Sequence, residues 1–132
     1  MATEALVAHE TPRQAPGRIL PHPVREARQR VDLGGVLIDR VDLGSAVDRV
    51  RGFLRSGKTN QIVTVNLDFV AISRRDQQFR DTLNAADLAV ADGMPLVWVS
   101  RLGDEPVPER LTGVELVDEC CQLALETGSS IF

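Results

Sequence analysis

The stretch "RGFLRSGKTNQIVTVN", residues 51–66, decides the fold because a helical pattern changes there into a strand pattern. Before Gly57, apolar residues recur at helical spacing, and this glycine stands where a helix would end. The segment "QIVTVN", residues 61–66, is short, apolar and rich in β-branched side chains, which favours a buried strand. A helix that leads into a buried strand is typical of an α/β protein with a parallel sheet.

The same stretch contains Gly52-x-x-x-x-Gly57-Lys58-Thr59, which matches the spacing of a phosphate-binding P-loop. A working P-loop needs a strand, then the glycine loop, then a helix whose N-terminus faces the phosphates. Here a helix precedes the loop and a strand follows it, so no helix N-terminus would face a ligand. We therefore interpret Gly57 as a helix end, with Lys58 near the negative end of the helix dipole, and reject nucleotide hydrolysis.

Strand and helix patterns alternate on both sides of this stretch. The predicted strands are residues 34–39, 61–66 and 87–92, and residues 129–132 are expected to open a further strand. Helices are predicted from Leu43 onward, with Asp42 as its cap, and over residues 67–75, 77–86, 93–103 and 113–128. This alternation predicts a Rossmann-like, mostly parallel α/β sheet with flanking helices.

Two further expectations concern the ends of the chain. Residues 1–30 are rich in Pro, Arg and small polar residues, so we expect a flexible tail followed by one α/β domain over residues 31–132. Because the chain stops where residues 129–132 would open a strand, we expect a truncated sheet and part of a longer protein. The alternative is a compact fold that ends on an edge strand.

Composition excludes several classes of function. The chain has 132 residues, of which 43% are hydrophobic and 26% charged, as in a soluble globular protein. Its net charge of −4 argues against a nucleic-acid groove, which needs a basic face. No apolar run approaches the roughly 20 residues that cross a bilayer, and the N-terminus does not resemble a secretion signal. We therefore expect a cytoplasmic protein.

Cysteine and histidine offer little chemistry. Cys120 and Cys121 are neighbours, so they cannot form an ordinary disulfide with each other, and we interpret them as buried small apolar residues in a reducing compartment. The two histidines, His9 and His22, lie in the expected tail. This leaves no histidine for a catalytic triad or a metal site in the folded part.

Polar residues at two predicted strand ends are the candidates for a site, because ligands of parallel α/β sheets bind beyond the C-terminal ends of the strands. Thr64 and Asn66 at one end offer neutral donors and acceptors for sugar hydroxyls. Asp92 and Gly93 at the next end combine a carboxylate with a turn whose amides can receive a diphosphate or a sugar oxygen. A purely structural interpretation stays open, in which Asp92 and Asn66 cap helices and Arg110 is a solvated connector residue.

These stretches, in this order, resemble the TagA/WecG/CpsF family of bacterial glycosyltransferases. The segment "TVNLDFVAISRRDQQFRDTLNAADLAVADGMPLVWVSRLG" is similar to the T-x-N and D-G regions of the family, and "PERLTGVELVDECCQLALETGSSIF" to its E-R-x-x-G region. "GGVLIDRVDLGSAVDRV" is similar to the opening segment of the family. The resemblance covers residues 31–132.

The resemblance implies an inverting glycosyltransferase. Family members move a sugar such as N-acetylmannosamine from a UDP donor to a polyprenyl-diphosphate-linked sugar, in the synthesis of cell walls, capsules or exopolysaccharides. They act without a metal cofactor, peripheral to the inner face of the cell membrane. By position, Asp92 resembles the proposed catalytic base, Thr64 and Asn66 the polar pocket, and Arg110 and Gly113 the E-R-x-x-G motif.

Two readings follow. The first is a glycosyltransferase, or its N-terminal part, with a UDP-sugar donor, a lipid-linked acceptor at the membrane surface and a possible homo-oligomer. The second is a non-catalytic truncated α/β module that binds a nucleotide sugar or a protein partner through its open sheet edge. The resemblance also implies that family domains continue beyond residue 132 into units that complete the donor pocket, so this chain could hold an incomplete site.

Overall fold

The computed structural model of the protein describes residues 28–132. The strands are β1 (Arg30–Leu33), β2 (Val36–Asp39), β3 (Ile62–Val65) and β4 (Leu88–Ala91). The helices are α1 (Leu43–Ser56), α2 (Leu67–Ser73), α3 (Gln77–Ala85), α4 (Met94–Ser100) and α5 (Gly113–Thr127). The α/β class predicted from the sequence is confirmed.

The strands form one parallel pair and one antiparallel hairpin. β3 and β4 run parallel, with Val65 opposite Ala91. β1 and β2 pair antiparallel across a turn at Gly34 and Gly35. The hairpin adjoins the parallel pair, because the carboxylate of Asp39 accepts a hydrogen bond of 2.8 Å from the amide of Ala89 in β4.

β1 was not predicted, and most of the expected tail over residues 1–30 lies outside the described residues. Arg30 already belongs to β1, so the folded part begins before residue 31. β1 was missed because Arg30-Val31-Asp32-Leu33 alternates charged and apolar residues. That pattern suits an edge strand that only its hairpin partner reveals.

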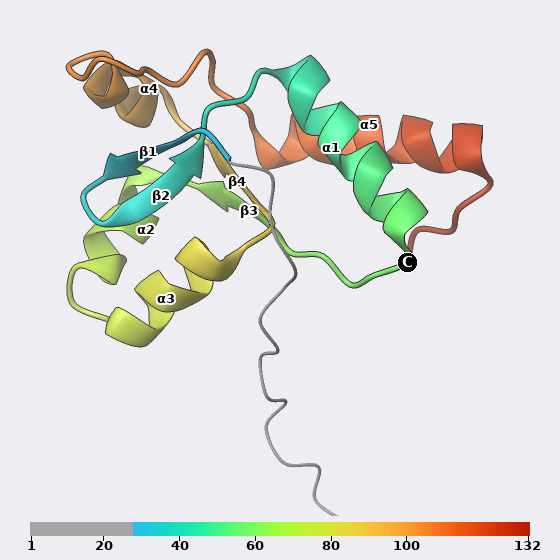
Figure 1. The fold of residues 1–132 in the computed structure, drawn as a ribbon, viewed down its shortest axis with the longest axis horizontal. Coiled ribbons are helices and arrows are strands. Elements are labelled where there is room, and N and C mark those ends of the chain that lie inside the picture. Colours follow the sequence, from blue (N-terminus) through green and yellow to red (C-terminus); the bar gives the residue numbers. More distant parts are fainter. Residues whose placement is uncertain (1–27) are drawn as a thin grey trace, which may run out of the picture.

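Helices cover both faces of the parallel strands (Figure 1). α1 and α5 contact each other on one face. Their core includes Val50, Leu88, Val90 and Leu116. The opposite face carries α2, α3 and α4, whose core contains Ile38, Val65, Leu83, Ala89, Leu96 and Val97. None of the helices in residues 28–132 is long and apolar enough to span a membrane.

Capping residues explain where the helices begin and end. Asp42 accepts a hydrogen bond from the amide of Ser45 at 2.8 Å and starts α1, as predicted. Gly57 ends the same helix at φ 62°, and Gly128 ends α5 at φ 67°; both are left-handed conformations that favour glycine. Pro95 is tolerated because it lies in the first turn of α4.

Two expectations about the C-terminal part were wrong. Residues 129–132 form no strand, and Ile131 and Phe132 are exposed. The amide of Ser129 bonds back to the carbonyl of Ala124, which closes the end of α5 instead of beginning a ladder. The cysteines are not both buried either, because Cys121 is exposed on α5 and Cys120 is half-buried; both are free thiols.

Candidate functional site

The C-terminal ends of β3 and β4 lie side by side, which brings the two predicted groups of polar residues to one edge of the sheet. The amide of Asp92 donates a hydrogen bond of 2.7 Å to the carbonyl of Val65, so the pairing extends one residue beyond β4. Because side chains alternate along a strand, Thr64, Val90 and Asp92 share one face. Val90 lies on this face and packs in the core that the sheet shares with the helices α1 and α5.

Gly113, the first residue of α5, contacts both strand ends. Its amide donates a hydrogen bond of 3.4 Å to Oδ2 of Asp92. A Cβ atom at Gly113 would lie 3.6 Å from Oγ1 of Thr64. Asp92, Thr64 and Gly113 therefore meet in one place, although 49 positions separate the first and last of them in the chain (113 − 64). Asp92 is half-buried.

The segment before α5 is attached by hydrogen bonds that sequence reasoning did not foresee. Oε1 of Glu109 accepts from the amide of Leu43 at 2.6 Å, which ties this loop to the N-terminus of α1. The amide of Leu111 donates to the carbonyl of Ala91 at the end of β4. Glu109 is the first residue of the E-R-x-x-G motif, so part of that motif has a structural task.

A capping box fixes the beginning of α5. The side chain of Thr112 accepts from the amide of Glu115, and the carboxylate of Glu115 accepts from the amide of Thr112 at 2.8 Å. Hydrogen bonds from the side chain and backbone of Thr112 hold the pKa of Glu115 below its usual range. The T-x-x-E spacing of this box is visible in the sequence and could have predicted the helix start.

The remaining predicted residues lie around this centre with different surroundings. Asn66 caps α2, because its Oδ1 accepts from the amide of Phe69 at 3.0 Å. Gly93 adopts φ 150°, a conformation that L side chains rarely take, and lets the chain turn from β4 into α4. Arg110 is exposed, and its charge contributes to lowering the pKa of Glu115; the structure shows no contact of Arg110 with Asp92 within residues 28–132.

Comparison with known protein families shows to which family this chain belongs. The profile of the glycosyl transferase WecG/TagA/CpsF family matches residues 31–132, which is most of the chain and the whole of the predicted domain. The chain belongs to the WecG/TagA/CpsF family. The sequence had already indicated this membership, and the match confirms it.

Curated relatives of this WecG/TagA/CpsF member occur in Staphylococcus aureus. Proteins of strains NCTC 8325 / PS 47, COL and MRSA252 are named N-acetylglucosaminyldiphosphoundecaprenol N-acetyl-beta-D-mannosaminyltransferase. Each is 31% identical to this chain over 110 residues. That match covers 82% of this chain but 43% of each relative, so it spans less than half of the relative's length.

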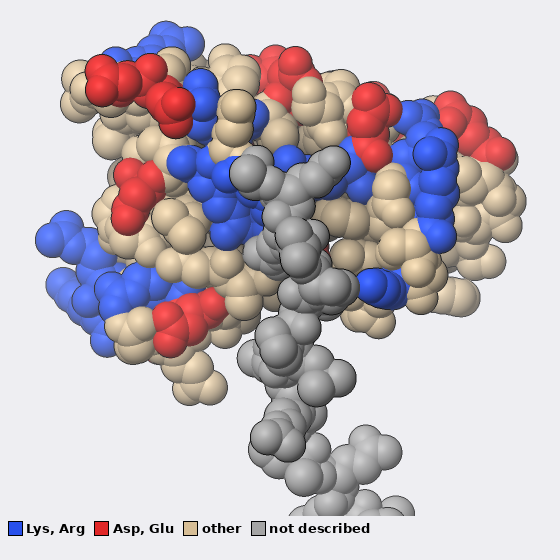
Figure 2. All heavy atoms as spheres, in the orientation of Figure 1, with Lys and Arg blue, Asp and Glu red and all other residues tan. Residues whose placement is uncertain are grey.

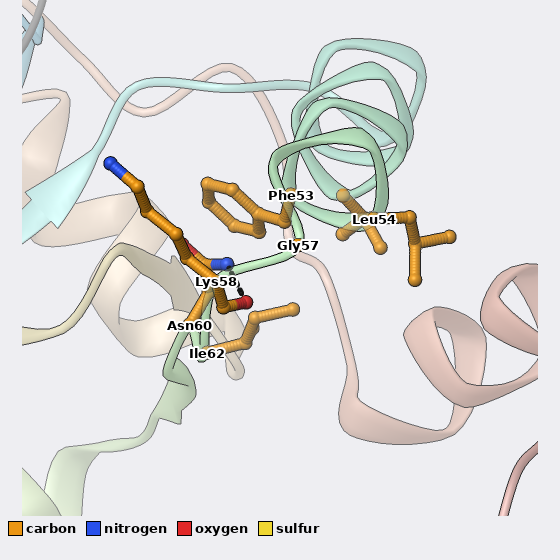
Figure 3. A pocket seen from close by; sticks show the side chains of 7 residues that line it. Phe53, Leu54, Gly57, Lys58, Asn60 and Ile62 are labelled. Carbon is orange, nitrogen blue, oxygen red and sulfur yellow. Dashed lines mark hydrogen bonds between the residues drawn. The ribbon is translucent and has the colours of Figure 1, made fainter.

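The pocket at the P-loop-like stretch lies at the opposite end of β3 from Asp92 and Thr64. It has a volume of about 380 Å³, and Val50, Phe53, Leu54, Gly57, Lys58, Asn60 and Ile62 line it. Figure 3 shows the Lys58 side chain extending away from Leu54, while the Asn60 amide bonds to the Lys58 carbonyl at 2.8 Å. Helix, glycine and strand follow in that order, so the rejection of a P-loop is confirmed.

A cluster of buried ion pairs lies outside the candidate site of this WecG/TagA/CpsF domain. The fully buried carboxylate of Asp39 forms ion pairs with three arginines: Arg28, Arg49 at 2.8 Å and Arg30 at 3.5 Å. Burial alone would raise the pKa of Asp39, but hydrogen bonds from Arg28 and from the Ala89 amide lower it below its ordinary value. Figure 2 shows several separate groups of basic side chains on one face of the molecule, with acidic groups between them.

Proposed function

We propose that this chain forms part of an inverting glycosyltransferase. It would move an N-acetylmannosamine-like sugar from a UDP-sugar donor to a polyprenyl-diphosphate-linked sugar during the synthesis of a cell-wall or surface polysaccharide. The names of the Staphylococcus aureus relatives support this choice of sugar and acceptor. The observation that carries the proposal is the meeting of Asp92, Thr64 and the Gly113 amide at one edge of the sheet.

Asp92 acts in this proposal as the general base. Gly113 engages Oδ2, so we assign Oδ1 to the acceptor hydroxyl. As the hydroxyl oxygen forms a bond to the anomeric carbon, its proton passes to the carboxylate of Asp92. The bond from the anomeric carbon to the diphosphate oxygen breaks on the opposite face, and UDP departs with that electron pair. Attack opposite to the leaving group inverts the anomeric centre.

The leaving diphosphate needs compensation for its charge. We assign this to the amides of the turn at Gly93 and to Arg110, whose guanidinium can form charge-assisted hydrogen bonds with phosphate oxygens. Arg110 is exposed, and its side chain would have to move toward the candidate site when the donor binds. The neutral side chain of Thr64 would hold a sugar hydroxyl. The proposed reaction uses no metal, so EDTA should leave the rate unchanged.

An assay with defined substrates tests the activity. The chain, and a version extended to the length of its relatives, would be incubated with UDP-N-acetylmannosamine and a short-chain N-acetylglucosaminyl-diphosphate lipid. We expect a disaccharide-diphosphate lipid whose new linkage has the inverted configuration. The proposal fails if the extended protein forms no such product while it remains folded by circular dichroism.

A second candidate is a non-catalytic α/β module that binds a nucleotide sugar or a protein partner. Calorimetry with UDP and UDP-sugars separates the two candidates. Binding by the extended protein together with turnover supports the transferase. Binding by this chain with no turnover in either version supports the module.

A further inference from the structure

The loop that joins α4 to α5, residues 101–112, is attached to the rest of the fold at several points. The amide of Val107 donates a hydrogen bond of 3.0 Å to Oγ of Ser100, and both residues are buried. Nε of Arg40 donates to the carbonyl of Pro106 at 3.2 Å. Connecting loops are usually more mobile than the elements that they join, so these bonds restrict the motion of this loop.

Arg110 lies between two further attachments of the loop. On one side, Oε1 of Glu109 accepts a hydrogen bond of 2.6 Å from the amide of Leu43, the first residue of α1. On the other side, the amide of Leu111 donates to the carbonyl of Ala91, the last residue of β4, at 2.9 Å. The backbone of Arg110 is therefore held on both sides, close to the end of the strand that leads into the candidate site.

The side chain of Arg110, in contrast, is not held. It is exposed, and within residues 28–132 it forms no hydrogen bond or ion pair. Its neighbour Glu109 does not pair with it and bonds to α1 instead. A guanidinium without a carboxylate partner keeps its donors for charge-assisted hydrogen bonds to another anion, such as a phosphate. Arg110 thus combines a restrained backbone with hydrogen-bond donors that a ligand can use.

The N-terminus of α1 explains why a glutamate suits position 109. The first amides of a helix have no acceptor within the helix. In α1, the N-cap Asp42 accepts from the amide of Ser45 and leaves the amide of Leu43 to another acceptor. The first turn of α1 contains no acidic residue. The Glu109 carboxylate supplies both the missing acceptor and a negative charge at the positive end of the helix dipole.

We propose that Glu109 is a positioning residue of the candidate site, which holds the backbone of Arg110 where its guanidinium can reach the diphosphate of a UDP-sugar. This inference rests on the proposed function, which assigns Arg110 to the leaving diphosphate. Glu109 itself contacts no substrate and acts through its bond to the Leu43 amide. A loop that is already held in place loses less conformational entropy when its arginine binds a phosphate, so the complex is tighter.

The alternative is that the bond from Glu109 only stabilises the fold. Glu109 is exposed, so one hydrogen bond contributes little to global stability and its loss should leave the protein folded. A purely structural bond would change stability, and any effect on UDP binding would be the same with or without Arg110. A positioning role changes UDP binding only while Arg110 is present. A double-mutant cycle between the two residues separates these cases.

The cycle uses the extended protein and calorimetry with UDP. Arg110→Ala should weaken UDP binding about tenfold or more, because a hydrogen bond to a charged group is lost. Glu109→Ala alone should weaken binding about threefold to tenfold, which is the usual size of coupling between neighbouring residues. When Arg110 is already alanine, Glu109→Ala should change the affinity by less than about twofold.

Two matched variants serve as controls. Glu109→Gln keeps the length of the side chain and its Oε1 acceptor, so it should bind UDP within about twofold of the unchanged protein. Asp104→Ala removes an exposed acidic residue from the same loop and should bind UDP as the unchanged protein does. In the chain of 132 residues, hydrogen exchange at the Leu43 amide should accelerate in Glu109→Ala and not in Asp104→Ala. Circular dichroism checks that all variants are folded.

Three results would overturn the inference. One is a folded Glu109→Ala variant that binds UDP as tightly as the unchanged protein, and another is an equal loss of affinity with and without Arg110. The third is an unchanged extended protein that does not bind UDP, which would also count against the proposed donor. If the two residues are coupled in UDP binding and no sugar is transferred, the inference stands and the proposed function alone fails.

Discussion

At the scale of single residues, the candidate site depends on how one carboxylate is held. The Gly113 amide lies 3.4 Å from Oδ2 of Asp92, a long hydrogen bond that orients the group without sequestering it. Thr64 adjoins the same glycine. A substrate hydroxyl that enters here would meet a carboxylate already turned toward the N-terminus of α5.

Replacing the carboxylate by an amide tests its role. We expect Asp92→Asn to lower turnover of the extended protein by about 10²–10⁴-fold, because general-base catalysis contributes that range. Binding of UDP, followed by calorimetry, should change little, since the amide keeps the size of the side chain. Asp118→Asn on the exposed side of α5 is the matched control and should leave turnover unchanged. Full activity of Asp92→Asn would remove the base assignment.

Sequence reasoning located part of this site for a clear physical reason. Thr64 and Asp92 were found because parallel strands end at one edge, and that rule needs only strand positions. The task of Asn66 as a helix cap was left as an alternative, and the structure shows that it caps α2. The bond from Glu109 to α1 could not be predicted, because it joins residues 66 positions apart across a loop.

At the scale of elements, α1 shows how two glycines of one motif have opposite effects. Gly57 ends the helix at φ 62°, whereas Gly52 lies inside it with an empty position for a Cβ. Neither position requires a glycine for the binding of a phosphate. Their substitution therefore separates backbone conformation from ligand binding.

Alanine substitutions of the two glycines should change the free energy of unfolding in opposite directions. Gly57→Ala should lower the free energy of unfolding by roughly 1 kcal/mol, because alanine is strained in the left-handed region. Gly52→Ala should raise it by about 0.5–1 kcal/mol, because alanine has the higher helix propensity. Urea denaturation of both variants measures the difference. Two destabilised variants would contradict the assignment of Gly52 to an open helix position.

Element boundaries that carry a local signal were predictable, and those set by distant partners were not. Asp42, Gly57 and Gly128 mark helix ends through their own side chains or conformations. β1 depends on its pairing with β2, and the expected strand over residues 129–132 has no neighbour to pair with in the described part of the chain. β-branched and apolar residues favour a strand, but hydrogen bonds to a partner make one.

At the scale of the whole molecule, Asp39 joins parts that are distant in sequence. Its carboxylate accepts from Ala89 in β4 and pairs with Arg49 of α1, and Arg28 and Arg30 reach it from the N-terminal side. It is fully buried, while the three arginines are 10–29% exposed. The β1–β2 hairpin, the parallel pair and α1 therefore share one buried anion.

Removing that charge should destabilise the fold. We expect Asp39→Asn to lower the free energy of unfolding by about 3 kcal/mol, because it leaves several largely buried arginines without their counter-charge. Arg49→Ala should cost less, since Arg49 is the most exposed of the three and the other two remain. Urea denaturation measures both. An Asp39→Asn variant with an unchanged free energy of unfolding would show that the cluster adds no stability.

The same carboxylate predicts how stability depends on pH. Burial raises the pKa of Asp39, but hydrogen bonds from Arg28 and Ala89 and the charge of Arg28 outweigh this and lower the pKa below 3.8. A carboxyl with a depressed pKa in the folded state adds stability above its unfolded pKa and loses it as the pH falls through the folded value. The difference in unfolding free energy between the unchanged chain and Asp39→Asn should therefore stay constant from about pH 7 to 5 and shrink below 3.8. Asp42 and Glu115, whose pKa values are also lowered, titrate in both proteins and cancel in the difference. A difference that grows on acidification would mean that the arginines do not stabilise the charged form of Asp39.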